Sequence, residues 1–196
     1  KLRIGSLEMS YLISTSGISS RKATLRSVSP TCPVPIAQWC DGPARLHSSI
    51  ANPFFGVGVQ SDLMNSDINA LYASQPDLIM GDRDYYLDPE NESIRTAYKE
   101  YLGKLFRLGG VPEADIEKAV AGVMNIETKL AEKSWSNVEL RNIPAQYNPT
   151  AKADFEKTYD AIDWEAYYKA MGIGDFDTII VTTKSSIANA NDLMKN

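Results

Sequence analysis

Residues 88–131 read DPENESIRTAYKEYLGKLFRLGGVPEADIEKAVAGVMNIETKLA, and this stretch predicts two consecutive helices. Asp88 suits the N-cap of the first helix, and Pro89 suits its first position, where a missing N–H costs nothing. Apolar residues then recur at steps of three and four, which places them on one face of a helix: Ile94, Ala97, Tyr98, Tyr101, Leu102, Leu105 and Phe106. Gly109 and Gly110 are expected to end this helix in a left-handed turn.

The second helix is predicted to open at Pro112 and Glu113, and Glu113 and Asp115 are favourable near its positive end. The same spacing continues in a stripe of Ile116, Ala119, Val120, Val123, Met124, Glu127, Leu130 and Ala131. Glu127 is the one polar member of that stripe. Because the connection between the two helices is very short, we expect them to form an antiparallel hairpin.

On the N-terminal side of this hairpin, residues 52–59 are apolar and rich in β formers, so they predict a strand or an extended buried segment. The pair Gly56 and Gly58 lacks a third glycine and a following helix with a ribose-binding acid, which excludes a dinucleotide fingerprint.

On the C-terminal side, residues 142–149 are predicted to form a loop, and a weaker helix follows around residues 151–159. Asp163 is a good N-cap for a further helix, which Gly172 ends. A β-branched run at residues 178–182 predicts a short strand. Ser185 or Ser186 can cap a last helix that runs through Met194. The fold class predicted from these elements is mainly α, a helical lobe with one or two short strands.

Composition narrows the class of protein. The chain has 196 residues, of which 43% are apolar, and this is enough for one ordinary domain with a core. Its net charge of −5 argues against a dedicated nucleic-acid binder, which normally presents a basic face. No stretch approaches the roughly 20 apolar residues that a membrane span requires.

The composition changes near Pro43. Residues 1–43 carry a net charge of +3 and the remaining residues −8, and the first stretch is rich in serine and proline without helical or strand periodicity. Cys32 and Cys40 either form a disulfide or remain two unpaired thiols. We therefore predict a division into an atypical segment, residues 1–43, for which an origin foreign to the domain is one interpretation, and an ordered region, residues 44–196.

Most catalytic chemistries are excluded by the residue inventory. His47 is the only histidine, whereas a zinc hydrolase commonly uses two, and no H-E-x-x-H is present. Ser-His-Asp catalysis would have to run through His47 without a Gly-x-Ser-x-Gly elbow. Asp82 and Asp84 flank Arg83, which favours an ion pair over a pair of acid and base carboxyls.

Two polar clusters remain as candidate sites. In the first, Asp82, Arg83, Asp84, Tyr85 and Tyr86 follow one another, and the arginine offers five donors that match carboxylates. This composition is typical of a loop that clamps onto a neighbouring helix. The second cluster, also interpreted as a packed and hydrogen-bonded loop, contains Trp135, Arg141, Asn142, Tyr147 and Asn148.

Taken in order, these clusters resemble the neprilysin family of zinc endopeptidases, in a form closest to the bacterial oligopeptidases. The matching pieces span residues 44–196 and are His47, Phe54 to Val59 with Asp62, Met80 to Leu87, Ile126-Glu127, Ser134-Trp135-Ser136, Arg141 to Pro144, Tyr147-Asn148, Phe155, Asp163-Trp164, Tyr167 and Ile180-Val181. Each motif alone is weak, and the specificity lies in their order and spacing.

The resemblance implies a mostly helical part of a larger, two-lobed peptidase with one catalytic zinc. In that family the H-E-x-x-H helix, the later glutamate ligand in E-x-x-x-D and the motif that binds the substrate backbone all lie downstream of the matched region. No catalytic or metal-binding residue is therefore assigned here, and no zinc is expected in this chain by itself. The implied partners are a C-terminal catalytic domain and peptide substrates, and the implied location is extracytoplasmic, either periplasmic or secreted in a bacterium.

Two functions from different classes follow. The chain is either the N-terminal, non-catalytic portion of a zinc metalloendopeptidase that hydrolyses short peptides, or a stand-alone helical binding or scaffold protein. If part of a larger lobe is absent, the apolar stripes after Asp88 are incompletely covered, and we expect the isolated chain to bind a hydrophobic dye or to associate.

Overall fold

The computed structural model describes residues 52–195. The predictions for Cys32, Cys40 and His47, and the division between residues 43 and 44, lie outside the described residues.

A small sheet of four strands is built from segments near both ends of the described sequence. Its strands are β1 (Gly56–Ser61), β2 (Asn69–Ser74), β3 (Pro149–Ala151) and β4 (Thr178–Val181), in the order β1-β2-β4-β3. β1 pairs antiparallel with β2, β2 pairs parallel with β4, and β4 pairs antiparallel with β3. The parallel pairing joins segments that lie about a hundred residues apart in the sequence, with Leu71 opposite Ile179.

Helices make up most of the rest of the described chain. In chain order they are α3 (Asp84–Leu87), the 3-10 helix η1 (Pro89–Asn91), α4 (Glu92–Leu108), α5 (Glu113–Ala131), the 3-10 helix η2 (Glu139–Arg141), α6 (Ile143–Gln146), α7 (Lys152–Thr158), α8 (Trp164–Met171) and α9 (Lys184–Lys195). The fold is therefore mainly α, as predicted, although its sheet has more strands than the one or two expected.

The helical hairpin is confirmed as α4 and α5, although Asp88 caps the 3-10 helix η1 and α4 itself begins at Glu92. Gly110 has a φ of 81°, and the N–H groups of Gly110 and Val111 donate to the carbonyl oxygens of Arg107 and Phe106. This is the double hydrogen bond of a Schellman C-cap, and it requires a residue that tolerates the left-handed conformation. The two glycines after the last periodic residue thus end α4 as predicted.

Contacts along the hairpin show that α4 and α5 are antiparallel. Arg107 forms an ion pair with Glu113 beside the turn, at 2.6 Å, and Tyr98 hydrogen-bonds to Glu127 two turns and more further along each helix. Between these pairs lies a buried apolar cluster of Tyr98, Leu102, Phe106, Ile116, Val123 and Met124, which we call the hairpin cluster.

A second apolar cluster covers one face of the sheet. It combines residues of β2 and β4 with aromatic side chains from the segment before β1 and from α7 and α8, and with the inner face of α9. Its larger members are Phe55, Leu71, Phe155, Tyr159, Trp164, Tyr167, Tyr168, Ile179, Val181 and Ile187. We call it the sheet-side core.

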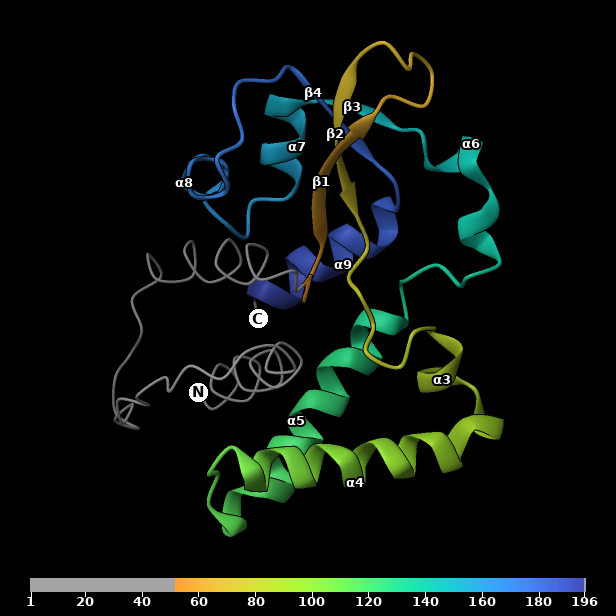
Figure 1. The fold of residues 1–196 in the computed structure, drawn as a ribbon, viewed down its shortest axis with the longest axis vertical. Coiled ribbons are helices and arrows are strands. Elements are labelled where there is room, and N and C mark those ends of the chain that lie inside the picture. The colour runs from red at the N-terminus through yellow and green to blue at the C-terminus, as the bar shows by residue number, and fades with distance from the viewer. Residues whose placement is uncertain (1–51, 196) are drawn as a thin grey trace.

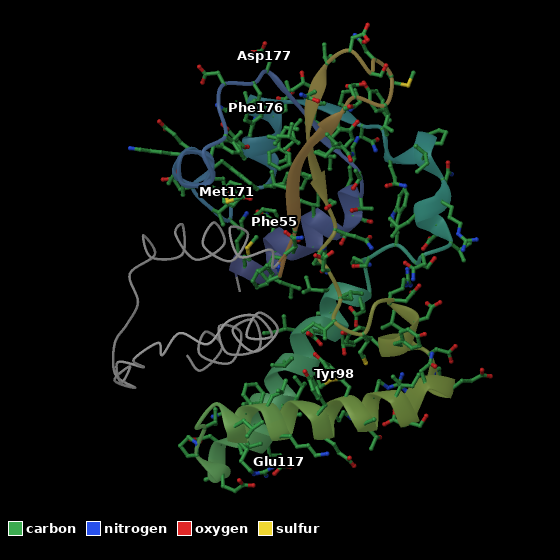
Figure 2. The ribbon with its side chains drawn as sticks, in the orientation of Figure 1. Phe55, Tyr98, Glu117, Met171, Phe176 and Asp177 are labelled. Carbon is green, nitrogen blue, oxygen red and sulfur yellow. The ribbon has the colours of Figure 1, made fainter. Side chains whose placement is uncertain are left out.

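α5 connects the two clusters. Figure 1 shows α4 at one end of the molecule, the sheet with α7, α8 and α9 at the other, and α5 reaching from the hairpin turn towards the sheet. Leu130, near the end of α5, belongs to the sheet-side core, and the Asn189 side chain of α9 donates to the Lys129 carbonyl oxygen at 2.7 Å. Figure 2 marks Phe55 in the sheet-side core and Tyr98 in the hairpin cluster.

Some predicted boundaries are corrected. α9 begins at Lys184, so neither Ser185 nor Ser186 caps it; the N–H of Ser186 donates instead to the carbonyl oxygen of Thr183. Residues 142–149 are not only a loop, because they include the single-turn helix α6. The aspartate expected to cap the helix at 163 does so, with its Oδ1 accepting from the N–H of Ala166 at 3.0 Å.

Exposed apolar side chains concentrate around the connection between β1 and β2. Val59, Leu63, Met64 and Ile68 are each at least half exposed. Hydrophobic dye binding stays a prediction; on the stripes after Asp88, where we expect it, Ile94 is 40% and Tyr101 51% exposed.

Candidate functional site

Arg83 lies where α3 meets the segment after α5. Its Nη1 donates to the carbonyl oxygen of Ser134 at 2.9 Å and lies 3.8 Å from a carboxylate oxygen of Glu139. The expected ion pair forms with Asp84 only, at 3.9 Å. Asp82 accepts instead from the N–H groups of Asp84 and Asn137, both at 3.1 Å. Because residues 82 and 83 both bind residues 134–139, the first cluster joins two segments that are about fifty residues apart.

Tyr86 and Tyr98 both point at Glu127, which is the polar residue in the hydrophobic stripe of α5. Tyr86 Oη donates to Oε2 at 3.1 Å and Tyr98 Oη donates to Oε1 at 3.2 Å. Tyr86 Oη also accepts from the N–H of Met80 at 3.1 Å. One carboxyl group therefore ties α3 and α4 to α5. The segment that was predicted to clamp as a loop, Asp84–Leu87, is instead the short helix α3.

The Glu127 side chain is only 8% exposed. Burial disfavours its charged form and raises its pKa to about 7, although the hydrogen bonds from Tyr98 and Tyr86 act in the opposite direction. A carboxyl group in this environment takes up a proton near neutral pH. The signal in the sequence was a single acidic residue at a core position of an amphipathic helix, and its partners were not predictable from spacing.

Trp135 is held by a residue that the sequence did not single out. The Gln75 side chain accepts from the Trp135 N–H at 2.8 Å and donates to the Trp135 carbonyl oxygen at 3.1 Å. This two-way bond attaches the segment after α5 to the end of β2. Tyr85 lies apart from it and contributes its carbonyl oxygen to Arg95 at 3.1 Å.

The remaining residues of the second cluster do not gather in one place. Tyr147 Oη donates to both carboxylate oxygens of Asp62, each at 3.1 Å, and so fixes the connection between β1 and β2. The Asn148 side chain donates to the carbonyl oxygen of Val181 in β4 at 3.0 Å. Arg141 and Asn142 are exposed. The predicted interpretation as one packed loop is therefore wrong for Arg141 and Asn142, because the chain turns outward into η2 and α6 there.

An open cleft of about 680 Å³ lies between the sheet and these clamped segments. Consecutive residues 56–60 of β1 line one side, and residues 75–78 and 81–83 line another. Trp135, Asn137, Leu140 and Gln146 close the third side.

The side chains in residues 52–195 do not suit a zinc ion, because they contain no group of three or more His, Cys, Asp and Glu side chains that could hold a metal. In the same residues, no helix is both long enough and apolar enough to cross a membrane.

The model of peptidase family M13, for its N-terminal region, matches residues 13–196. The chain therefore belongs to peptidase family M13, the neprilysin family of metalloendopeptidases, as its motifs predicted.

Curated relatives match over much of this chain. Endothelin-converting enzyme 1 of Rattus norvegicus is 31% identical over 151 residues, which cover 73% of this chain and 20% of the relative. Neprilysin-3 of Drosophila melanogaster is 25% identical over 151 residues, with coverage of 73% and 19%. The chain spans about a fifth of the length of the curated relatives it matches.

Solved structures show the same fold. Zinc metalloprotease Zmp1 of Mycobacterium tuberculosis, in complex with an inhibitor, superimposes with a TM-score of 0.75 at 19% identity, covering 98% of this chain and 30% of that one. PepO of Lactobacillus rhamnosis has a TM-score of 0.63 at 18% identity, covering 81% and 25%.

Proposed function

We propose that this chain is the N-terminal, non-catalytic portion of a zinc-dependent metalloendopeptidase that hydrolyses short peptides. The family match across residues 13–196 carries the proposal. A further support is that the sequence holds one histidine, whereas the H-E-x-x-H motif of such enzymes needs two. Zinc would be held by residues of the longer protein, and peptide substrates and the catalytic domain would be its partners.

Within that protein, the ten residues of the two polar clusters would be structural. Asp82, Arg83 and Tyr86 bind the backbone or side chains of distant segments rather than facing one another across a reaction site. Their chemistry is that of clamps between helices. An extracytoplasmic location is part of the proposal and follows from the family resemblance.

Extension of the gene sequence and measurement of metal content test the proposal. We expect an H-E-x-x-H followed by E-x-x-x-D beyond Asn196, and about one zinc per molecule with chelator-sensitive peptide hydrolysis in the longer protein. The 196-residue chain serves as the control and should bind no zinc stoichiometrically and cleave nothing. Chelator-sensitive hydrolysis by the chain alone would overturn the proposal, as would a gene without the downstream motif, which would indicate a helical binding or scaffold protein.

A further inference from the structure

On β1, the cleft is lined at Gly56 and Gly58 by backbone without side chains, and Tyr72 and Ser74 of β2 lie opposite these glycines. In the β1–β2 pairing, Val57 lies opposite Ala73 and Val59 opposite Leu71, and both partners belong to the sheet-side core. Side chains alternate along a strand, so Gly56, Gly58 and Gln60 belong to the other face. At Gly58 an added Cβ would meet no atom within 4 Å, which shows open space directly above the strand.

Gly56 and Gly58 lie on the same face of β1, and glycine in a strand lowers its stability because no side chain packs there. Glycine within a strand often marks a place where a ligand or another backbone approaches closely, because it presents no side chain. At Gly56, packing within the protein accounts for the glycine, because an added Cβ would lie 2.5 Å from the Ser74 Oγ. At Gly58, no atom of the described residues would clash with an added Cβ, and this glycine lines the cleft.

The walls of the cleft offer the groups that a peptide backbone uses. Gln60 and Asn137 bring primary amides, which donate and accept like the peptide group itself. Trp135 supplies a half-buried ring on a segment that Gln75 holds in place. Gln60 lies on β1, whereas Trp135 and Asn137 lie on the segment after α5, which Asp82 and Arg83 hold.

The charges in the cleft select among ligands. Asp77, Asp82 and Arg83 line it, a net of one negative charge. Two carboxylates disfavour a polyanion such as nucleic acid. They leave an uncharged or weakly basic chain as the compatible occupant.

We propose that this cleft binds an extended peptide whose main chain lies against Gly58, between the sheet and the Trp135 segment. The inference rests on the proposed function, since a peptidase meets peptides as substrates. It adds a peptide-binding site within this chain, formed without the zinc ligands.

Calorimetric titration of the 196-residue chain with a capped, uncharged hexapeptide of alternating alanine and threonine tests the site. Gly58→Val fills the open space above the strand, and Gly174→Val is the matched control, because neither glycine has an atom within 4 Å of its added Cβ or a positive φ. We expect saturable binding by the unmodified chain and by Gly174→Val, and binding weaker by about tenfold or more in Gly58→Val. Thermal unfolding of both variants verifies that they are folded.

The same hexapeptide with alternate N-methyl groups is the second probe. Methylation removes backbone donors and adds bulk where the backbone must approach, so binding should disappear. Equal binding of the methylated peptide, absence of saturable binding to the unmodified chain, or undiminished binding to Gly58→Val would each overturn the inference. Self-association lost in Gly58→Val without any peptide binding would overturn it in favour of a second copy as occupant.

The peptide titration and the hydrolysis assay of the proposed function give independent outcomes. Peptide binding is measured on the chain without zinc, and hydrolysis is measured on the longer protein. Hydrolysis without cleft binding would reject only the inference, whereas binding without zinc-dependent hydrolysis would reject the proposed activity.

Discussion

The sheet-side core and the hairpin cluster are stabilised by different chemistry. In the sheet-side core, aromatic rings pack against one another: Phe155 lies 4.8 Å from Trp164 and Phe55 lies 5.3 Å from it, between centroids. The hairpin cluster is smaller, mostly aliphatic on α5, and ends at Glu127, a buried carboxyl held by two tyrosines.

This difference shows how the two regions respond to conditions. Apolar burial and ring packing do not depend on pH, whereas a buried carboxyl gains or loses a proton as pH changes. The hairpin is therefore expected to be the pH-sensitive region and the sheet-side core the insensitive one. Each prediction below tests one side of this comparison.

The largest effect is expected from Phe155→Ala. The side chain is fully buried and has ring contacts with Tyr159 and Trp164. We expect a loss of about 3–5 kcal/mol in the free energy of unfolding, measured by urea denaturation. Phe106→Ala in the hairpin cluster is the matched variant, because Phe106 is 1% exposed. It should cost about 1 kcal/mol less, since ring pairs add that much in the sheet-side core. An equal or larger loss at Phe106 would reject the comparison.

The pH dependence of stability is the next effect. The pKa of Glu127 is raised by burial from 4.5 in the unfolded chain to about 7, so the folded state binds the proton more tightly. The stabilisation is complete below about pH 4.5 and is lost as pH rises through 7, a change of about 3 kcal/mol. Carboxyls with lowered pKa, such as Glu92 and Glu113, change stability only below that window.

Glu127→Gln isolates this effect. The unfolding free energy of the variant should be nearly flat between pH 5 and pH 8, a flattening worth about 3 kcal/mol relative to the unmodified chain. Glu117→Gln, on the exposed side of the same helix (Figure 2), is the control and should keep the slope. An unchanged slope in Glu127→Gln would show that another group titrates.

Tyr98→Phe should have a smaller effect that itself depends on pH. At pH 8 the ionised Glu127 loses one of its two donors, and we expect a loss of about 1–3 kcal/mol by urea denaturation. At pH 5 the neutral acid needs that donor less, so the loss should shrink. Tyr101→Phe is the control, because Tyr101 is 51% exposed on the same helix. A pH-independent loss would argue that the tyrosine only packs.

The smallest effect is expected at the helix ends, where the two regions are alike. Gly110 ends α4 with a φ of 81° and Gly172 ends α8 with a φ of 68°. Alanine at either position is strained in the left-handed conformation and should cost about 1–2 kcal/mol, measured as the shift of the thermal midpoint. A much larger cost at one glycine would mean that the two turns carry unequal parts of the stability.

Elements whose signal is local were predictable. The stripe from Ile94 to Phe106 and the two glycines after it identified α4, and Asp163 and Gly172 delimited α8. The strand β2, by contrast, was not predicted. Its residues Asn69–Ser74 include alanine, asparagine and serine, which have little β preference, and pairing on both sides rather than propensity makes it a strand.

The candidate site was predictable in its parts and not in its assembly. Asp82 to Tyr86 were recognised as a polar clamp, but their partners Ser134, Asn137 and Glu127 lie about fifty residues away. Gln75 was not noticed, because a single glutamine before a proline has no pattern of its own. The cleft is made by three segments that meet only in the folded chain.

The amino-acid sequence by itself determined the helical hairpin, the glycine C-terminal ends of α4 and α8, and the family, because periodicity, capping residues and motif order are carried by neighbours along the chain. Only the tertiary structure decided that β2 pairs with β4, that Tyr86 and Tyr98 share one carboxyl of α5, and that Gly58 lines a cleft. These depend on contacts between distant segments, whose energies appear only when the whole chain has brought them together.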